Sequence, residues 1–105
     1  MNKVILIGRL TKDPVAKEFG KGKNANKVAK YTLAVDRVGS DESDFIRCSV
    51  FGSGADFAEK YLEKGKKIAV VGSIQSGSYE NEDGETVYTM DVVVREHYFC
   101  EKKEK

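Results

Sequence analysis

Residues 44–52 read Asp-Phe-Ile-Arg-Cys-Ser-Val-Phe-Gly, and this stretch decides the fold that we expect for the rest of the chain. In a β-strand, successive side chains point to opposite sides. Ile46, Cys48 and Val50 then make a row that faces a core. The opposite side of the same strand carries Phe45, Arg47, Ser49 and Phe51.

The second row indicates a surface that a partner can reach, because it places an arginine and a serine beside two phenylalanines. Aromatic rings beside a cation suit stacked bases and phosphates, and stacking contributes roughly 1–3 kcal/mol per base whatever the sequence. The alternative is that Phe45 and Phe51 cover a second hydrophobic layer or a subunit contact. The strand alone leaves both interpretations open.

Length and composition favour one small domain. A chain of 105 residues can bury one core, and a small all-β barrel fits this size. The sequence contains no apolar run long enough for a membrane span and no signal peptide pattern, so we expect a cytoplasmic protein with no membrane contact. Cys48 and Cys100 lie far apart and His97 is the only histidine, so we predict no metal site and no cofactor, and we assign His97 to the surface without a role.

The net charge of +1 hides an uneven distribution. Residues 1–38 carry nine Lys/Arg against three Asp/Glu, whereas both later segments are net acidic. Phosphate contacts are therefore expected mainly from the N-terminal third. A solvated lysine-rich loop is the simpler alternative.

The N-terminal part predicts two strands separated by a loop. Residues 3–10 form a strand that is apolar on both faces, which predicts an oligomer seam on the side away from the core. Residues 11–28 contain several turn-forming residues and five lysines, so we expect a long mobile loop there. Residues 29–35 alternate as a second strand, which fixes Lys30 on a rigid element.

The C-terminal half predicts a helix and a hairpin arm. Residues 53–56 match a capping signature that starts with Ser53, and Gly65 is expected to end the helix. Residues 67–77 predict a strand with Ile74 among its inward residues, and residues 86–95 predict its return. The Asp-Gly turn at 83–84 lies at the tip of an arm that carries Tyr79 and Tyr88.

This order of elements predicts the fold class. Three strands, a helix and two more strands make an all-β, five-stranded OB-fold barrel. One short helix lies between strands 3 and 4, and a long hairpin arm lies between strands 4 and 5.

The sequence also resembles the bacterial-type single-stranded DNA-binding proteins. The similarity is carried by Met-Asn-Lys-Val-Ile-Leu-Ile-Gly-Arg-Leu-Thr-Lys-Asp-Pro at 1–14, Val-Phe-Gly at 50–52, Tyr-Leu-Glu-Lys-Gly at 61–65, Gly-Ser-Ile at 72–74, Tyr-Glu-Asn-Glu-Asp-Gly at 79–84 and Tyr-Thr-Met-Asp-Val-Val-Val at 88–94. It implies a binding domain over residues 1–100 and a homotetramer that wraps and protects single-stranded DNA in replication, recombination and repair. It also implies a cytoplasmic location, with nucleoid association when DNA is bound.

Residues and resemblance together give the candidate site. The stacking residues are expected to be Phe45, Phe51, Tyr79 and Tyr88. The phosphate-binding residues are expected to be Lys3, Arg9, Lys12, Lys23, Lys27, Lys30, Arg37, Arg47 and Lys64.

Several positions depart from the family pattern. Gly39 lies where many relatives have tryptophan, and Gln75 and Gly77 replace frequent basic residues, so we expect one stacking site fewer and a weaker salt dependence. Residues 101–105 form a short charged tail without the family's acidic tip. We expect this chain, whether naturally short or a truncated core, to recruit replication enzymes weakly or not at all.

Other functions remain possible at this point. An OB-fold of this type can bind RNA, or act as an accessory primosome subunit without strong DNA binding. A structural protein could bury the aromatic face in an oligomer. An enzyme is the weakest alternative, because the sequence offers no metal cluster, no phosphate loop and no nucleophile with a nearby histidine.

Overall fold

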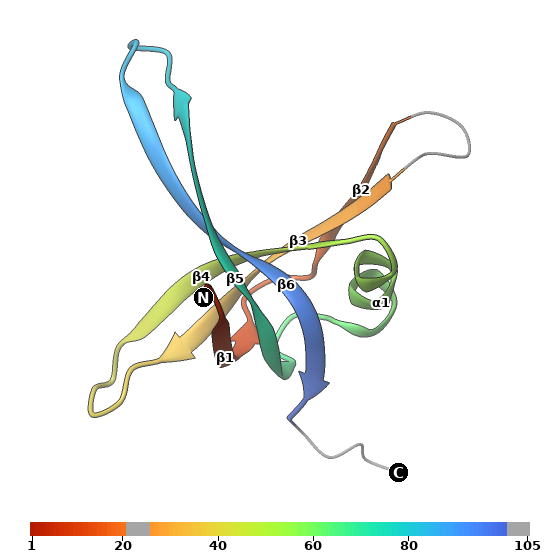
Figure 1. Cartoon of the computed structure of the whole chain (residues 1–105). Helices are drawn as coiled ribbons and strands as arrows, with labels where there is room; N and C mark the ends of the chain where they lie inside the picture. Colours follow the sequence, from red (N-terminus) through yellow and green to blue (C-terminus); the bar gives the residue numbers. More distant parts are fainter. Residues whose placement is uncertain (21–25, 101–105) are drawn as a thin grey trace.

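The computed structural model describes residues 1–20 and 26–100 (Figure 1). In chain order, the elements of these residues are β1 (Val4–Leu10), β2 (Val15–Phe19), β3 (Asn26–Asp36), β4 (Ser43–Phe51), α1 (Ser53–Tyr61), β5 (Lys67–Glu80) and β6 (Thr86–Phe99).

Five of the strands close into a barrel. The strands are hydrogen-bonded in the order β1-β5-β6-β4-β3-β2, and β1 also pairs with β3, which closes the ring. The β4–β6 pairing is parallel and the others are antiparallel. The predicted OB-fold barrel, with its helix between β4 and β5 and its arm between β5 and β6, is confirmed.

The predicted loop over residues 11–28 is wrong in its middle part. Val15–Phe19 forms β2, which pairs with the first half of β3 in a ribbon that leaves the barrel (Figure 1). A short strand is stabilised by its hydrogen bonds to a partner strand more than by the strand propensity of its own residues. The pairing with β3 therefore forms although this stretch contains lysine and glycine. Lys23 lies outside the described residues.

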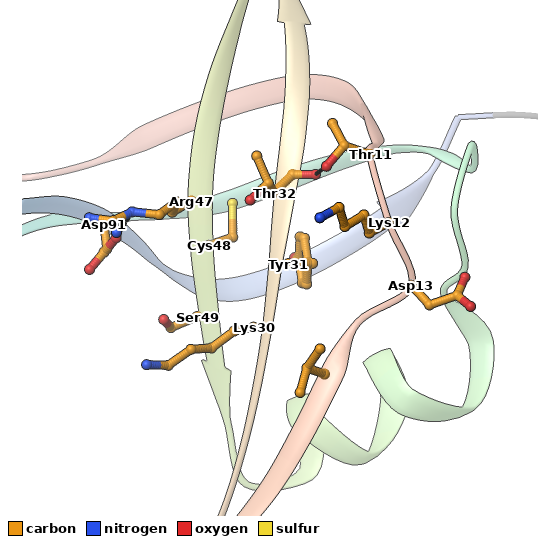
Figure 2. A pocket seen from close by; sticks show the side chains of 11 residues that line it. Thr11, Lys12, Asp13, Lys30, Tyr31, Thr32, Arg47, Cys48, Ser49 and Asp91 are labelled. Atoms are coloured by element: carbon orange, nitrogen blue, oxygen red, sulfur yellow. Dashed lines mark hydrogen bonds and ion pairs between the residues drawn. The ribbon is translucent and has the colours of Figure 1, made fainter.

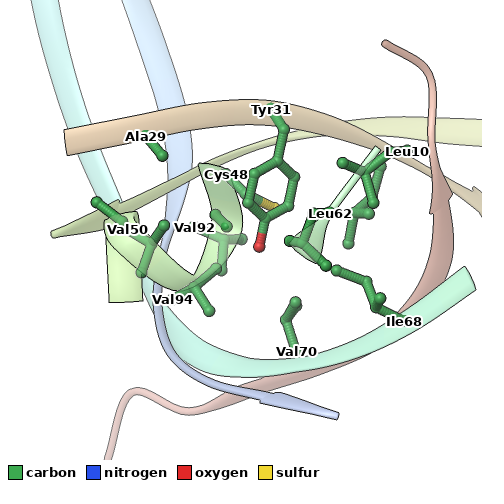
Figure 3. Close-up of a cluster of buried hydrophobic side chains, with 13 residues drawn as sticks. Leu10, Ala29, Tyr31, Cys48, Val50, Leu62, Ile68, Val70, Val92 and Val94 are labelled. Carbon is green, nitrogen blue, oxygen red and sulfur yellow. The ribbon is translucent and has the colours of Figure 1, made fainter. Parts of the chain in front are cut away.

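The core follows the strand alternation that the sequence predicts. Tyr31 and Leu33 of β3 and Cys48 and Val50 of β4 point inward, where they meet residues of the other strands and of α1 (Figure 3). The cluster consists of Leu10, Ala29, Tyr31, Leu33, Cys48, Val50, Ala55, Ala58, Leu62, Ile68, Val70, Val92 and Val94. Phe45 and Phe51 therefore fall on the outside of β4.

Both predicted ends of α1 need correction. Ser53 is the first helical residue and not the cap, because the chain turns at Gly52, whose φ of 66° favours glycine and whose carbonyl oxygen accepts from the Ala55 and Asp56 N–H groups. The helix ends at Tyr61, so Gly65 lies in the following turn and not at the helix end. Among the described residues, no helix is long and apolar enough to span a membrane.

The β5–β6 arm begins where β1 stops supporting β5. The β1–β5 pairing starts at Val4 opposite Gly72, and beyond it the two arm strands rise away from the barrel (Figure 1). Ile74 was predicted to point into the core but is 42% exposed, because the barrel interior ends before it. At the tip, the predicted turn is confirmed: Asn81 Oδ1 accepts from the Asp83 and Glu85 N–H groups.

His97 was expected on the surface, and this expectation is wrong. It is half-buried, its Nε2 lies 2.7 Å from Tyr31 Oη in a hydrogen bond, and the Phe57 ring stacks on it at a centroid distance of 5.2 Å. Burial lowers the pKa of His97 below its ordinary value. The histidine therefore connects α1, β3 and β6 as a neutral ring.

Candidate nucleic-acid interface

The outside of the β2-β3-β4 sheet combines aromatic and cationic side chains. Residues paired across two strands point to the same face, and Arg47 pairs with Thr32, Ser49 with Lys30, and Lys30 with Val15. We define the outer face as Val15, Lys17 and Phe19 of β2, Lys30 and Thr32 of β3, and Phe45, Arg47, Ser49 and Phe51 of β4.

The two phenylalanines of β4 mark the ends of this face. Phe45 is 68% exposed and Phe51 is 51% exposed, as the alternation predicted. Six residue steps separate them, which corresponds to about 20 Å along the strand. Arg47 and Ser49 lie between them, so two rings that can stack on bases flank groups that can bind phosphates.

Phe19 adds an aromatic residue that sequence reasoning missed. Its ring packs edge-on against Phe51, with centroids 6.4 Å apart and ring planes at 90°, and it remains 45% exposed. The alternation of Val15, Lys17 and Phe19 was the available signal, but it was assigned to a loop. The end of the outer face is therefore a corner of two perpendicular rings.

A pocket of about 240 Å³ opens between these strands (Figure 2). Lys12, Lys30 and Arg47 contribute its positive charges, and Asp91 of β6 lies beside Arg47. The full lining is Thr11, Lys12, Asp13, Val15, Lys30, Tyr31, Thr32, Arg47, Cys48, Ser49 and Asp91. Burial raises the pKa of the Cys48 thiol to about 12, so this part of the pocket wall is neutral at pH 7.

Several of the predicted phosphate-binding residues pair with carboxylates of the chain itself, among them Lys27, Arg37 and Arg47. Lys27 Nζ pairs with Asp56 at 2.9 Å and also with Glu59, so its side chain points to α1. The hydrogen bonds to Glu59 and Asp56 raise the pKa of Lys27 above its ordinary value. Lys27 is therefore less available to a DNA phosphate than the sequence suggested, because its ammonium group already pairs with two carboxylates.

Arg37 lies in a similar arrangement at the β3–β4 connection. Its guanidinium donates to both oxygens of Asp44 at 2.8–3.1 Å and to Glu42 at 2.7 Å. The hydrogen bonds to Asp44 raise the pKa of Arg37, and the same contact lowers the pKa of Asp44. One guanidinium meets two carboxylates here, so these three side chains together carry a net negative charge.

The remaining predicted cations are exposed, but they do not form one cluster. Lys12 and Lys30 line the pocket and make no ion pair with any described residue. Arg9 donates to the Gly65 carbonyl at 2.9 Å. Lys3 and Lys64 are exposed outside the pocket lining.

The two arm tyrosines point to opposite faces of the arm. Tyr79 pairs with Val87 and Tyr88 pairs with Ser78, which are adjacent steps of the ladder. Tyr79 shares its side with Asp91 and so continues the outer face. Tyr88, which is 81% exposed, faces the other way, so the four predicted stacking residues do not share one surface.

The closed barrel and this face place the chain in the OB-fold class of binding modules. The model of the single-strand binding protein family matches residues 1–100. The chain belongs to this family.

Relatives with assigned names cover nearly the whole chain. A single-stranded DNA-binding protein of Clostridium perfringens (strain 13 / Type A) is 49% identical over 102 residues, which is 96% of this chain and 67% of that protein. Single-stranded DNA-binding protein 3 of Clostridium acetobutylicum is 47% identical over 105 residues, with 96% and 72% covered. Single-stranded DNA-binding protein 1 of Staphylococcus aureus (strain COL) is 43% identical over 108 residues, with 98% and 63% covered. The chain thus spans about two thirds of the length of these relatives.

Proposed function

We propose that this chain binds single-stranded DNA without regard to base sequence. The observation that carries the proposal is the exposure of Phe45 and Phe51 on one strand face, with Arg47 between them and Lys30 on the neighbouring strand. Bases stack on the rings, and the cations attract the phosphate backbone and release counterions. The contacts use features that every nucleotide has, so no base is preferred.

The roles divide between the parts of the outer face. Phe45 and the Phe19–Phe51 corner are the stacking positions of the barrel, and Tyr79 extends them onto the arm. Lys12, Lys30 and Arg47 bind phosphates at the pocket. Lys27 and Arg37 contribute less, because each of them pairs with two carboxylates, whereas Arg47 pairs with Asp91.

A titration with labelled oligo-dT at several salt concentrations tests this function. Binding should weaken linearly on a log–log plot of affinity against salt, with a slope of about −0.7 for each phosphate contact. Duplex DNA of equal length should bind much more weakly, because its bases are already stacked. An equal-length oligo-U competitor separates DNA from RNA binding. No binding of oligo-dT at low salt would refute the proposal.

We also propose that the chain works as a homo-oligomer, a homotetramer by the family resemblance, and that it acts in the cytoplasm. The support is the outward face of β1, where Ile5 is 65% exposed and Ile7 is 53% exposed. Sedimentation at micromolar concentration measures the mass of the assembly. Ile5→Lys should lower this mass, whereas the control Val38→Lys in the β3–β4 turn should leave it unchanged. A monomeric wild-type chain would contradict the proposal.

A further inference from the structure

Asp91 is a carboxylate inside a cationic pocket. It lies on β6, next to the short parallel contact in which Cys48 of β4 pairs with Val92 of β6. Its Oδ1 lies 3.0 Å from Arg47 Nε in an ion pair, and the Asp91 and Arg47 side chains are 36% and 58% exposed. The ion pair is therefore on the outer face and open to a ligand (Figure 2).

The pocket's other acidic residue has a different partner. Asp13 Oδ1 accepts the Lys64 backbone N–H at 2.8 Å, which ties it to the turn after α1. Lys12 and Lys30 have no carboxylate partner among the described residues. Asp91 is therefore the acidic group that bears directly on the pocket's arginine.

The pairing changes what Arg47 can offer. A guanidinium has five N–H donors, and the ion pair places Asp91 next to Nε, so the N–H groups of the two terminal nitrogens can still donate to a phosphate. The incoming phosphate must then share the cation with a carboxylate at close range. The phosphate and the Asp91 carboxylate are both negative, so they repel each other when both contact Arg47. The repulsion is strongest where the sheet excludes part of the water.

We infer that Asp91 is an internal anion that competes with the DNA phosphate for Arg47 and so limits both the affinity and its salt dependence. The inference builds on the proposed function and concerns the same site. When Asp91 offsets the charge of Arg47, contact between Arg47 and a phosphate releases few counterions from the DNA. Without Asp91, Arg47 would contribute one full phosphate contact to the salt dependence. The chain thereby binds single strands less tightly than its aromatic face would allow.

The ion pair is not needed to hold the sheet together. Cys48 and Val92 are buried next to it, at 1% and 4% exposure, and they pack in the core. Exposed ion pairs contribute little to stability. Asp91→Asn keeps the size of the side chain and one carbonyl oxygen and removes the negative charge, so it isolates the electrostatic effect.

The test measures oligo-dT binding by Asp91→Asn across a salt series. We expect binding at low salt to tighten by roughly threefold to tenfold and the log–log slope to steepen by about 0.7. Asp91→Ser should change both values in the same direction. Asp83→Asn at the arm tip removes the same charge away from the pocket and should have a smaller effect. Unchanged or weaker binding by Asp91→Asn would overturn the inference.

A double-mutant cycle with Arg47→Gln identifies the route. If Asp91 acts through Arg47, then Asp91→Asn should tighten binding little or not at all in the Arg47→Gln background. An equal gain in both backgrounds would mean general repulsion of DNA and would overturn the inference. Wild-type protein that fails to bind at any salt concentration refutes the proposed function itself, which is a distinguishable result.

Discussion

Replacing Phe51 by alanine separates stacking from packing at the corner of the outer face. Phe51 is 51% exposed, and its ring packs against the ring of Phe19 at a centroid distance of 6.4 Å. One side of the ring therefore packs on the protein, while the rest is open to a base. The substitution should weaken DNA binding strongly and stability moderately.

The two magnitudes follow from the exposure. Stacking of one base contributes roughly 1–3 kcal/mol, so the Kd should rise about 5-fold to 150-fold. Phe→Ala costs about 3–5 kcal/mol in a full core, and a half-exposed ring loses about half of that, or about 2 kcal/mol. A domain with about 5–15 kcal/mol of stability stays folded after this loss.

The assay compares oligo-dT affinity by fluorescence anisotropy with the free energy of unfolding in denaturant. Phe51→Leu keeps most of the apolar bulk but has no π-face, so it should lose affinity and retain stability. Tyr98→Ala is the matched control, because Tyr98 is 53% exposed on the C-terminal half of β6 and lies outside the outer face. It should leave the affinity unchanged.

Two results would refute the reasoning. If Phe51→Ala unfolds at room temperature, the ring belongs to the core and the assignment of faces on β4 is reversed. If Phe51→Leu binds as well as the wild type while Phe51→Ala does not, the ring acts through packing and not through stacking. Either result would move the stacking role to other residues.

Three further predictions concern charge, packing and pH. Lys30→Gln should make the salt slope of oligo-dT binding shallower by about 0.7, as measured in the same titration. Gly72→Ala should lower the free energy of unfolding by about 1–3 kcal/mol in urea, because a β-carbon there would collide with the Val93 carbonyl oxygen. Burial lowers the pKa of His97, so the unfolded chain takes up the proton first and stability should fall as the pH drops below 6.5, whereas His97→Gln should remove this part of the pH dependence in denaturant melts.

Strand alternation explains why the barrel and the exposed position of the β4 phenylalanines could be predicted. β4 pairs with a neighbouring strand on each side, so each of its side chains points either into the barrel or away from it. An alternation with a period of two therefore places Cys48 inside and Phe51 outside, as the structure does. The same reasoning failed for Ile74. Its position in the alternation is inward, but its burial depends on where β1 begins, at Val4 opposite Gly72, and that boundary is a property of a distant segment.

The sequence could not predict which charged residues form ion pairs with each other, for a related reason. Lys27 meets Glu59, and Arg47 meets Asp91, across separations that no local pattern encodes. A count of lysines and arginines therefore overstated the cations that are available for phosphates. Only the closed sheet shows that β6 brings a carboxylate to the middle of the outer face.

The division between barrel and arm decides which aromatic residues dominate binding. β4 is hydrogen-bonded to β3 on one side and to β6 on the other, so Phe45 and Phe51 are presented by a supported strand. The arm has two strands, and its tyrosines point to opposite sides, so we expect a single strand of DNA on the outer face to meet Tyr79 and not Tyr88. A rigid platform loses less conformational freedom when a base stacks on it than a two-stranded arm does. We therefore expect the rings of β4 to contribute most of the stacking energy and the arm to extend the site that the barrel forms.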